Sequence, residues 1–168
     1  QQLRQQRSSQ LRDRIIEAMT TNETSWFRDI HPFNILHERI LPELGKGRKT
    51  PIRVWSAACS SGQEPYSISM SVHEYQMTNP GALTAEVQIL GTEISPAMIQ
   101  VARTARYDTL AMARGLSPER RQRYFRQHGD QLEVIPEIRT RVQFQQQNLL
   151  QSFALLGRFD MIFCRNVL

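Results

Sequence analysis

The stretch "WSAACSSGQEPYS", from Trp55 to Ser67, decides the fold. Its apolar start predicts a β-strand, the small residues before Gly62 predict a tight turn, and the run from Glu64 onward predicts a helix. A strand, a turn and a helix in this order are typical of α/β proteins that hold a nucleotide at the turn. However, the turn has one glycine and no lysine or arginine, and it matches neither common phosphate-binding pattern. Because Glu64 would repel a diphosphate, the sequence predicts a ligand that carries positive charge.

Helices are predicted before this stretch. Apolar residues recur at helical spacing within residues 11–19 and 32–44, and "GKGRKTP", from Gly45 to Pro51, is a loop by composition. We therefore expect residues 1–48 to form a helical segment, the remnant of a helical domain and its linker.

Strands and helices alternate after the loop. Serine followed by proline marks two helix starts, at Ser95 and Ser117. The strands are expected within residues 52–58, 86–94, 142–148 and 158–166. The last of them is a nearly continuous apolar run, which is typical of a buried parallel strand. Residues 49–168 are thus predicted to form an α/β domain with a partial sheet of about four parallel strands, truncated at its C-terminal side.

Composition limits the class of protein. The chain has 168 residues, of which 40% are hydrophobic and 22% charged, and no apolar run approaches the roughly 20 residues that cross a bilayer. With two cysteines and no signal-peptide pattern, a cytoplasmic protein without membrane insertion is expected. The four histidines show no metal-ligand spacing, so no metal site is expected. The net charge of +5 favours an acidic partner.

Polar residues follow each predicted strand. They are Glu64, Glu93, Asn148, and Arg165 with Asn166. Because the carboxyl ends of parallel strands meet at one edge of a sheet, these side chains are expected to line one ligand site. Glu93 is placed to accept hydrogen bonds from ribose hydroxyls, and the alternative is an acid that stabilises the following helix start. A ligand with adenosine at one end and a positive charge at the other would fit these residues, and S-adenosylmethionine is such a ligand.

Six segments together resemble the CheR family of chemotaxis receptor methyltransferases. They are "TTNETSWFRD" from Thr20, "WSAACSSGQEPYSISM" from Trp55, "ILGTEIS" from Ile89, "YDTLAMARGLSPERRQRYF" from Tyr107, "NLL" from Asn148 and "FDMIFCRNVL" from Phe159. The resemblance implies a Rossmann-like class I methyltransferase fold. It also implies methyl transfer from S-adenosylmethionine to glutamate side chains on the cytoplasmic helices of chemoreceptors, with S-adenosylhomocysteine as the product.

The resemblance also implies functional residues. Cofactor contacts are expected at Asn22, Thr24, Arg28, Glu64, Glu93, Asn148, Leu149, Arg165 and Asn166. Arg28 is expected to be catalytic as well, because a planar guanidinium can orient the acceptor carboxylate. One departure is Glu93, where the family usually has aspartate. The small β-subdomain of the family is expected beyond Leu168.

Several alternatives remain open. The arginines between Arg103 and Arg126, including Arg120 and Arg123, either contact glutamate-rich receptor helices or form solvated helix faces. A methyltransferase with another acceptor and an inactive cofactor-binding scaffold are both compatible with the sequence. A nucleic-acid-binding module lacks a recognition motif and leaves the two glutamates unexplained, so no nucleic-acid partner is expected. The unpaired edge of the last strand predicts either a longer parent protein or a dimer.

Overall fold

The computed structural model describes residue 11 and residues 23–167. The helix predicted within residues 11–19 lies, apart from Leu11, outside the described residues. Within the described part, no helix is long and apolar enough to cross a membrane.

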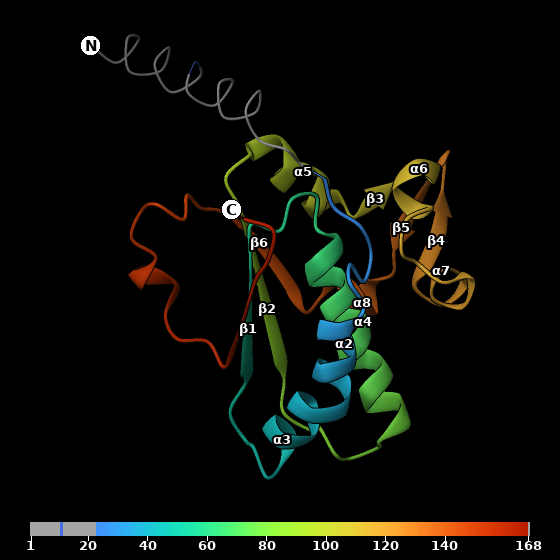
Figure 1. Ribbon diagram of the computed structural model, residues 1–168. Helices are drawn as coiled ribbons and strands as arrows, with labels where there is room; N and C mark the ends of the chain where they lie inside the picture. The colour runs from blue at the N-terminus through green and yellow to red at the C-terminus, as the bar shows by residue number, and fades with distance from the viewer. Residues whose placement is uncertain (1–10, 12–22, 168) are drawn as a thin grey trace.

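The main sheet has four parallel strands in the order β6-β2-β1-β7 (Figure 1). Their bounds are β1 (Ile52–Ala57), β2 (Val87–Glu93), β6 (Val142–Gln146) and β7 (Met161–Cys164). All four lie within the predicted ranges, so the α/β fold with a partial parallel sheet is confirmed. In the register of the sheet, Ala57 is opposite both Thr92 and Cys164, so the three carboxyl ends meet at one edge.

The last strand, β7, is less buried than its apolar sequence predicted. Phe163 is buried, but the side chain of Ile162 is 55% exposed and Cys164 is exposed as well. The reason is its position, because β7 pairs with β1 and is an edge strand of the described sheet. An apolar run is therefore not sufficient to place a strand in the interior of a sheet.

Helices cover one face of the sheet (Figure 1). They are α2 (His31–Ile35), the π-helical turn η1 (Leu36–Ile40), α3 (Leu41–Gly45), α4 (Gln63–Thr78), α5 (Pro96–Thr104) and α8 (Pro136–Arg139). The Ser95 hydroxyl accepts a hydrogen bond from the Met98 amide and caps α5, as the sequence predicted. Phe33 and Leu36 share one buried core with the strand residues Ile52 and Val54. The described part of the N-terminal segment is thus packed against the α/β domain.

A second, smaller sheet is inserted between α5 and β6. It is antiparallel with the order β3-β5-β4, and it includes β3 (Arg106–Tyr107), β4 (Phe125–His128) and β5 (Gln131–Val134). Two short helices, α6 (Thr109–Met112) and α7 (Pro118–Tyr124), connect β3 to β4, and Ser117 caps α7. This sheet lies within the chain and is separate from the small β-subdomain that was expected beyond Leu168. Its strands are too short to give a clear alternating pattern.

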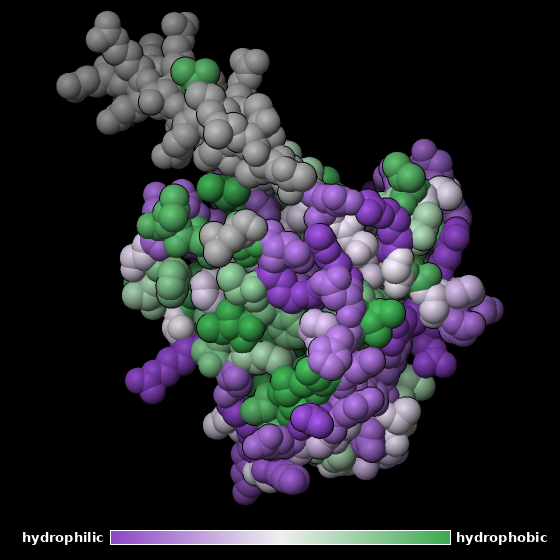
Figure 2. All heavy atoms as spheres, viewed as in Figure 1, coloured by the Kyte–Doolittle hydropathy of each residue, from purple (hydrophilic) through white to green (hydrophobic). Residues whose placement is uncertain are grey.

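The other face of the main sheet carries the segment 147–160, which includes the short 3-10 helix η2 (Ala154–Leu156). Trp55 stacks on Phe159 with ring centroids 5.5 Å apart and anchors this segment. Hydrophobic side chains gather on this side of the molecule, at the left in Figure 2. The large exposed hydrophobic residues of the segment include Leu150, Phe153 and Leu155.

Candidate functional site

A cavity of about 630 Å³ lies at the carboxyl ends of the parallel strands. Nine cofactor-binding residues were predicted, and eight of them line this cavity: Thr24, Arg28, Glu64, Glu93, Asn148, Leu149, Arg165 and Asn166. The ninth, Asn22, lies outside the described residues. The volume is within the range of about 300 to 1,000 Å³ that small-molecule sites usually have. The tertiary structure therefore brings together residues that are up to 142 positions apart in the sequence.

The turn after β1 forms the floor of the cavity. Ala58, Ser60 and Gly62 have positive φ angles of 57°, 49° and 95°. Glycine is required at 62, since a Cβ atom there would lie 2.9 Å from the Cβ of Ala102. Ala58 and Ser60 adopt a left-handed conformation that is unfavourable for residues with a side chain, and it persists only where surrounding contacts fix the backbone. One contact that fixes this turn is the hydrogen bond of 2.9 Å from the Cys59 amide to the Thr92 carbonyl.

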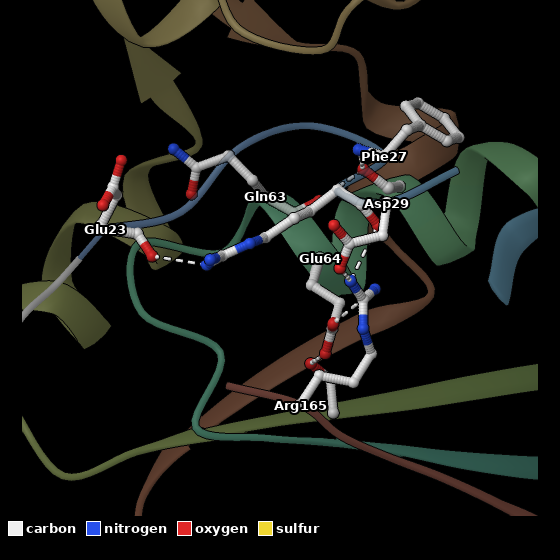
Figure 3. Close-up of polar contacts among 9 residues, drawn as sticks. Glu23, Phe27, Asp29, Gln63, Glu64 and Arg165 are labelled. Atoms are coloured by element: carbon white, nitrogen blue, oxygen red, sulfur yellow. Dashed lines mark hydrogen bonds and ion pairs between the residues drawn. The ribbon is translucent and has the colours of Figure 1, made fainter. Parts of the chain in front are cut away.

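Glu64 lies in the first turn of α4 and points into the cavity (Figure 3). The Ser56 hydroxyl donates a hydrogen bond of 2.8 Å to its Oε1, and Arg165 Nη1 lies 3.5 Å from its Oε2. Burial raises the pKa of Glu64, while the Ser56 hydrogen bond and the charges of Arg165 and Arg28 act in the opposite direction. A cationic ligand beside this carboxylate would stabilise its ionised form.

Arg165 joins the end of β7 to the segment before α2. Besides Glu64, its guanidinium contacts the Asp29 carboxylate and donates a hydrogen bond of 2.8 Å to the Arg28 carbonyl. Asp29 and Arg165 face each other directly in Figure 3. The side chain of Arg28 is partly exposed, and its Nη1 donates a hydrogen bond of 3.2 Å to the Glu23 carbonyl. Arg28 therefore stands at the rim of the cavity.

Glu93 is 5% exposed and is held by three backbone amides. Its Oε2 accepts a hydrogen bond from Ser60, and its Oε1 accepts hydrogen bonds from Ile94 and Ser95, at 2.7 to 3.0 Å. An ionised carboxylate has about four acceptor positions, so one position on Oε2 remains for a ligand hydroxyl. Glu93 thus closes the turn after β1 in addition to lining the cavity.

Three residues that support this site were not predicted from the sequence. Ser56 supports Glu64 from beneath, Asp29 holds Arg165, and Tyr107 donates a hydrogen bond of 2.7 Å to the Ser61 carbonyl of the turn. All three lie in the segments that carry the family resemblance, which was the available signal for them.

Arg120, one of the arginines expected to contact a partner, is paired within the chain. Its guanidinium makes two hydrogen bonds to the Glu74 carboxylate, at 2.9 and 2.8 Å, and lies 3.7 Å above the ring of Phe27. Arg120 therefore joins α7 to α4. Arg121, Arg123 and Arg126 are exposed on the same part of the molecule.

Comparison with known proteins identifies the family. The SAM-binding domain of the CheR methyltransferases matches residues 22–168. The chain is 58% identical over 160 residues to chemotaxis protein methyltransferase 1 of Pseudomonas aeruginosa, covering 94% of this chain and 58% of the relative. It is 50% identical over 170 residues to chemotaxis protein methyltransferase Cher2 of Pseudomonas putida, covering 100% of this chain and 62% of the relative. A Listeria monocytogenes chemotaxis protein methyltransferase is 36% identical over 158 residues, which cover 94% of this chain and 57% of the relative.

The chain spans about three-fifths of the length of these curated relatives. The matched region includes the main sheet, the inserted small sheet and the described residues of the cavity. The chain belongs to the CheR methyltransferase family.

Proposed function

We propose that this protein transfers the methyl group of S-adenosylmethionine to glutamate side chains of chemoreceptor cytoplasmic domains. The products are glutamate methyl esters and S-adenosylhomocysteine, and the role is adaptation in chemotaxis. The observation that carries the proposal is the convergence of eight predicted cofactor residues on one cavity at the strand ends of a CheR-family chain.

The residues of the cavity fit this cofactor. The carboxylate of Glu64 offers a partner for a cationic group, and Glu93 retains an acceptor position for a ribose hydroxyl. Small side chains at Ala58 and Ser60 leave the backbone of the turn open to close approach. S-adenosylmethionine supplies a methyl group on a positively charged sulfur.

The acceptor needs no strong general base. A glutamate side chain has an ordinary pKa of about 4.3 and is ionised near neutral pH. Its carboxylate oxygen attacks the methyl carbon in line, a carbon–oxygen bond forms, the carbon–sulfur bond breaks, and the electron pair stays on sulfur. The protein contributes positioning at roughly 3 to 3.5 Å and exclusion of water. Arg28, at the rim of the cavity, is proposed to orient the acceptor carboxylate.

The proposed partner is the glutamate-rich part of the chemoreceptor helices, which would place the enzyme in the cytoplasm. Exposed arginines in and next to the small sheet, Arg121, Arg123 and Arg126, offer a positively charged surface that is complementary to the negative charge of glutamates. The hydrophilic surface at the right of Figure 2 includes this part of the molecule.

Methyl transfer to receptor membranes tests the proposal. The full-length protein is incubated with tritium-labelled S-adenosylmethionine and membranes that contain chemoreceptors, and base-labile radioactivity is counted. Transfer to receptors supports the proposal, and transfer only to other acceptors would identify a methyltransferase of different specificity. Cofactor binding without any transfer would indicate an inactive scaffold.

A further inference from the structure

Tyr107 connects the small sheet to the turn that forms the floor of the cavity. It lies in β3 and is 3% exposed, and its hydroxyl donates a hydrogen bond of 2.7 Å to the carbonyl of Ser61. Burial raises the pKa of Tyr107 well above its ordinary value of about 10, so the hydroxyl stays protonated and remains a donor. Tyr107 does not line the cavity itself.

The turn needs support from its surroundings. Ala58 and Ser60 hold left-handed backbone conformations that are unfavourable for residues with a side chain. The end of β2 holds one side of the turn, through the Thr92 carbonyl and the Glu93 carboxylate. Tyr107 reaches the following residue, Ser61, from a different sheet.

Tyr107 also contacts the segment that contains Thr24 and Arg28. Its ring packs edge-on against Trp26, with ring centroids 4.9 Å apart and an interplanar angle of 80°. The Trp26 indole nitrogen donates a hydrogen bond of 3.0 Å to the Ala111 carbonyl, and the Trp26 amide donates one of 3.1 Å to the backbone carbonyl of Arg114. Trp26 lies between Thr24 and Arg28, which line the cavity. One side chain of the small sheet thus touches both the turn and the segment that bears Arg28.

We propose that Tyr107 is a positioning residue for the cofactor turn and that, through it, the small sheet sets the affinity for S-adenosylmethionine. The hydroxyl acts on the ligand indirectly, by holding Ser61 and the left-handed residues before it. This inference rests on the proposed function of the cavity.

The variant Tyr107→Phe tests this role in the full-length protein, because it removes one hydroxyl and keeps the ring against Trp26. Tyr66→Phe is a matched control, since the Tyr66 hydroxyl donates a hydrogen bond of 2.8 Å to the Ala102 carbonyl, and Tyr66 does not line the cavity. Isothermal titration calorimetry is expected to give a Kd for S-adenosylmethionine about three- to tenfold higher for Tyr107→Phe. The control is expected to change the Kd less than about twofold, with a comparable loss of Tm.

Two further measurements separate positioning from general destabilisation. Amide hydrogen exchange at Gly62, whose N–H bonds the Cys59 carbonyl, is expected to accelerate in Tyr107→Phe and to stay unchanged in Tyr66→Phe. Adding Ala58→Gly to Tyr107→Phe is expected to recover part of the affinity, because glycine adopts the left-handed conformation without strain.

Three outcomes would each overturn the role of Tyr107 and leave the proposed function of the cavity intact. They are an unchanged Kd in Tyr107→Phe, an equal loss of affinity in both tyrosine variants, and no recovery with Ala58→Gly. If the wild-type protein binds no S-adenosylmethionine, the proposed function of the cavity fails, and the inference fails with it. The wild-type titration therefore distinguishes the two failures.

Discussion

Arg165 Nη1 lies 3.5 Å from Glu64 Oε2, which joins the residue after β7 to the first turn of α4 across the cavity. Both side chains are largely buried, with exposures of 17% and 16%. The turn after β1 has no basic residue of its own, and this arginine follows β7, which is far away in the sequence but pairs with β1 in the sheet. The Glu64 carboxylate therefore has the Arg165 guanidinium on one side and the cavity, which can hold a cationic ligand, on the other.

Replacing Glu64 tests the charge that the ligand needs. We expect Glu64→Gln to weaken the binding of S-adenosylmethionine roughly 10- to 100-fold, because the cationic ligand loses a charged partner at a largely buried position. Glu64→Lys is expected to abolish binding. Calorimetric titration measures both, and Glu38→Gln, at an exposed helical position, is the control. Retained affinity in both Glu64 variants would contradict the role assigned to this carboxylate.

The pH dependence of binding follows from the same residue. The pKa of Glu64 is raised above 4.5 by burial, so the carboxylate gains a proton at a higher pH than an exposed glutamate does. Affinity for a cationic ligand is therefore expected to fall as the pH drops through this raised pKa. The variant Glu64→Gln should bind weakly and lack this dependence. Titrations at several pH values above 4.5 check the prediction.

The raised pKa of Glu64 also makes the stability of the fold depend on pH. A raised pKa in the folded state stabilises the fold below the unfolded pKa, and this contribution is lost as the pH rises through the folded pKa. We therefore expect Glu64→Gln to gain thermal stability relative to the wild type near neutral pH and to lose that advantage in acid. Calorimetric unfolding at pH 7 and near pH 4 gives the comparison.

Variants of Arg28 test the catalytic step separately from the binding of the cofactor. If it orients the acceptor carboxylate, Arg28→Ala should lower the rate of methyl transfer about 100-fold at saturating S-adenosylmethionine. Arg28→Lys should restore only part of the rate, because a lysine lacks the planar pair of donors. Single-turnover transfer to receptor membranes measures the rate, and an unchanged rate in Arg28→Ala would exclude the catalytic role.

Two arginines of α7 are expected to behave differently. Arg120→Ala should lower the free energy of unfolding by about 1 kcal/mol, because it loses the contacts with Glu74 and Phe27 at a partly exposed site. Arg123→Glu should leave stability unchanged and weaken receptor binding at low salt, since Arg123 is exposed. Thermal unfolding and co-sedimentation with receptor membranes distinguish them. Receptor binding that is insensitive to Arg123→Glu would remove the basic surface from the proposed interface.

The β7 edge predicts self-association of the 168-residue chain. Ile162 is exposed on this edge strand, and unpaired apolar edges favour pairing with another strand. Ile162→Lys should shift the sedimentation profile of the 168-residue chain toward the monomer, because a charge on an edge strand opposes pairing. A wild-type chain that stays monomeric at high concentration would refute the predicted dimer.

Local sequence patterns predicted the strands of the main sheet and the polar residues at their carboxyl ends. The spacing of apolar residues indicated the strands and helices, and Ser95 and Ser117 marked two helix starts because capping is a local interaction. The polar strand ends could be grouped because parallel strands bring their carboxyl ends to one edge of a sheet. The family resemblance added Thr24, Arg28 and Leu149 to that group.

Only the tertiary structure decided which groups meet one another. Arg165 and Asp29 are separated by 136 positions, Tyr107 and Ser61 by 46, and Arg120 and Glu74 also by 46. No local pattern encodes such pairs, because they depend on how β7, the small sheet and α4 pack. The exposure of β7 has the same origin, since its apolar sequence fits a central strand and an edge strand equally well. The sequence by itself thus predicted a site for a cationic nucleoside ligand, whereas long-range packing decided how the carboxylates and the turn of that cavity are held.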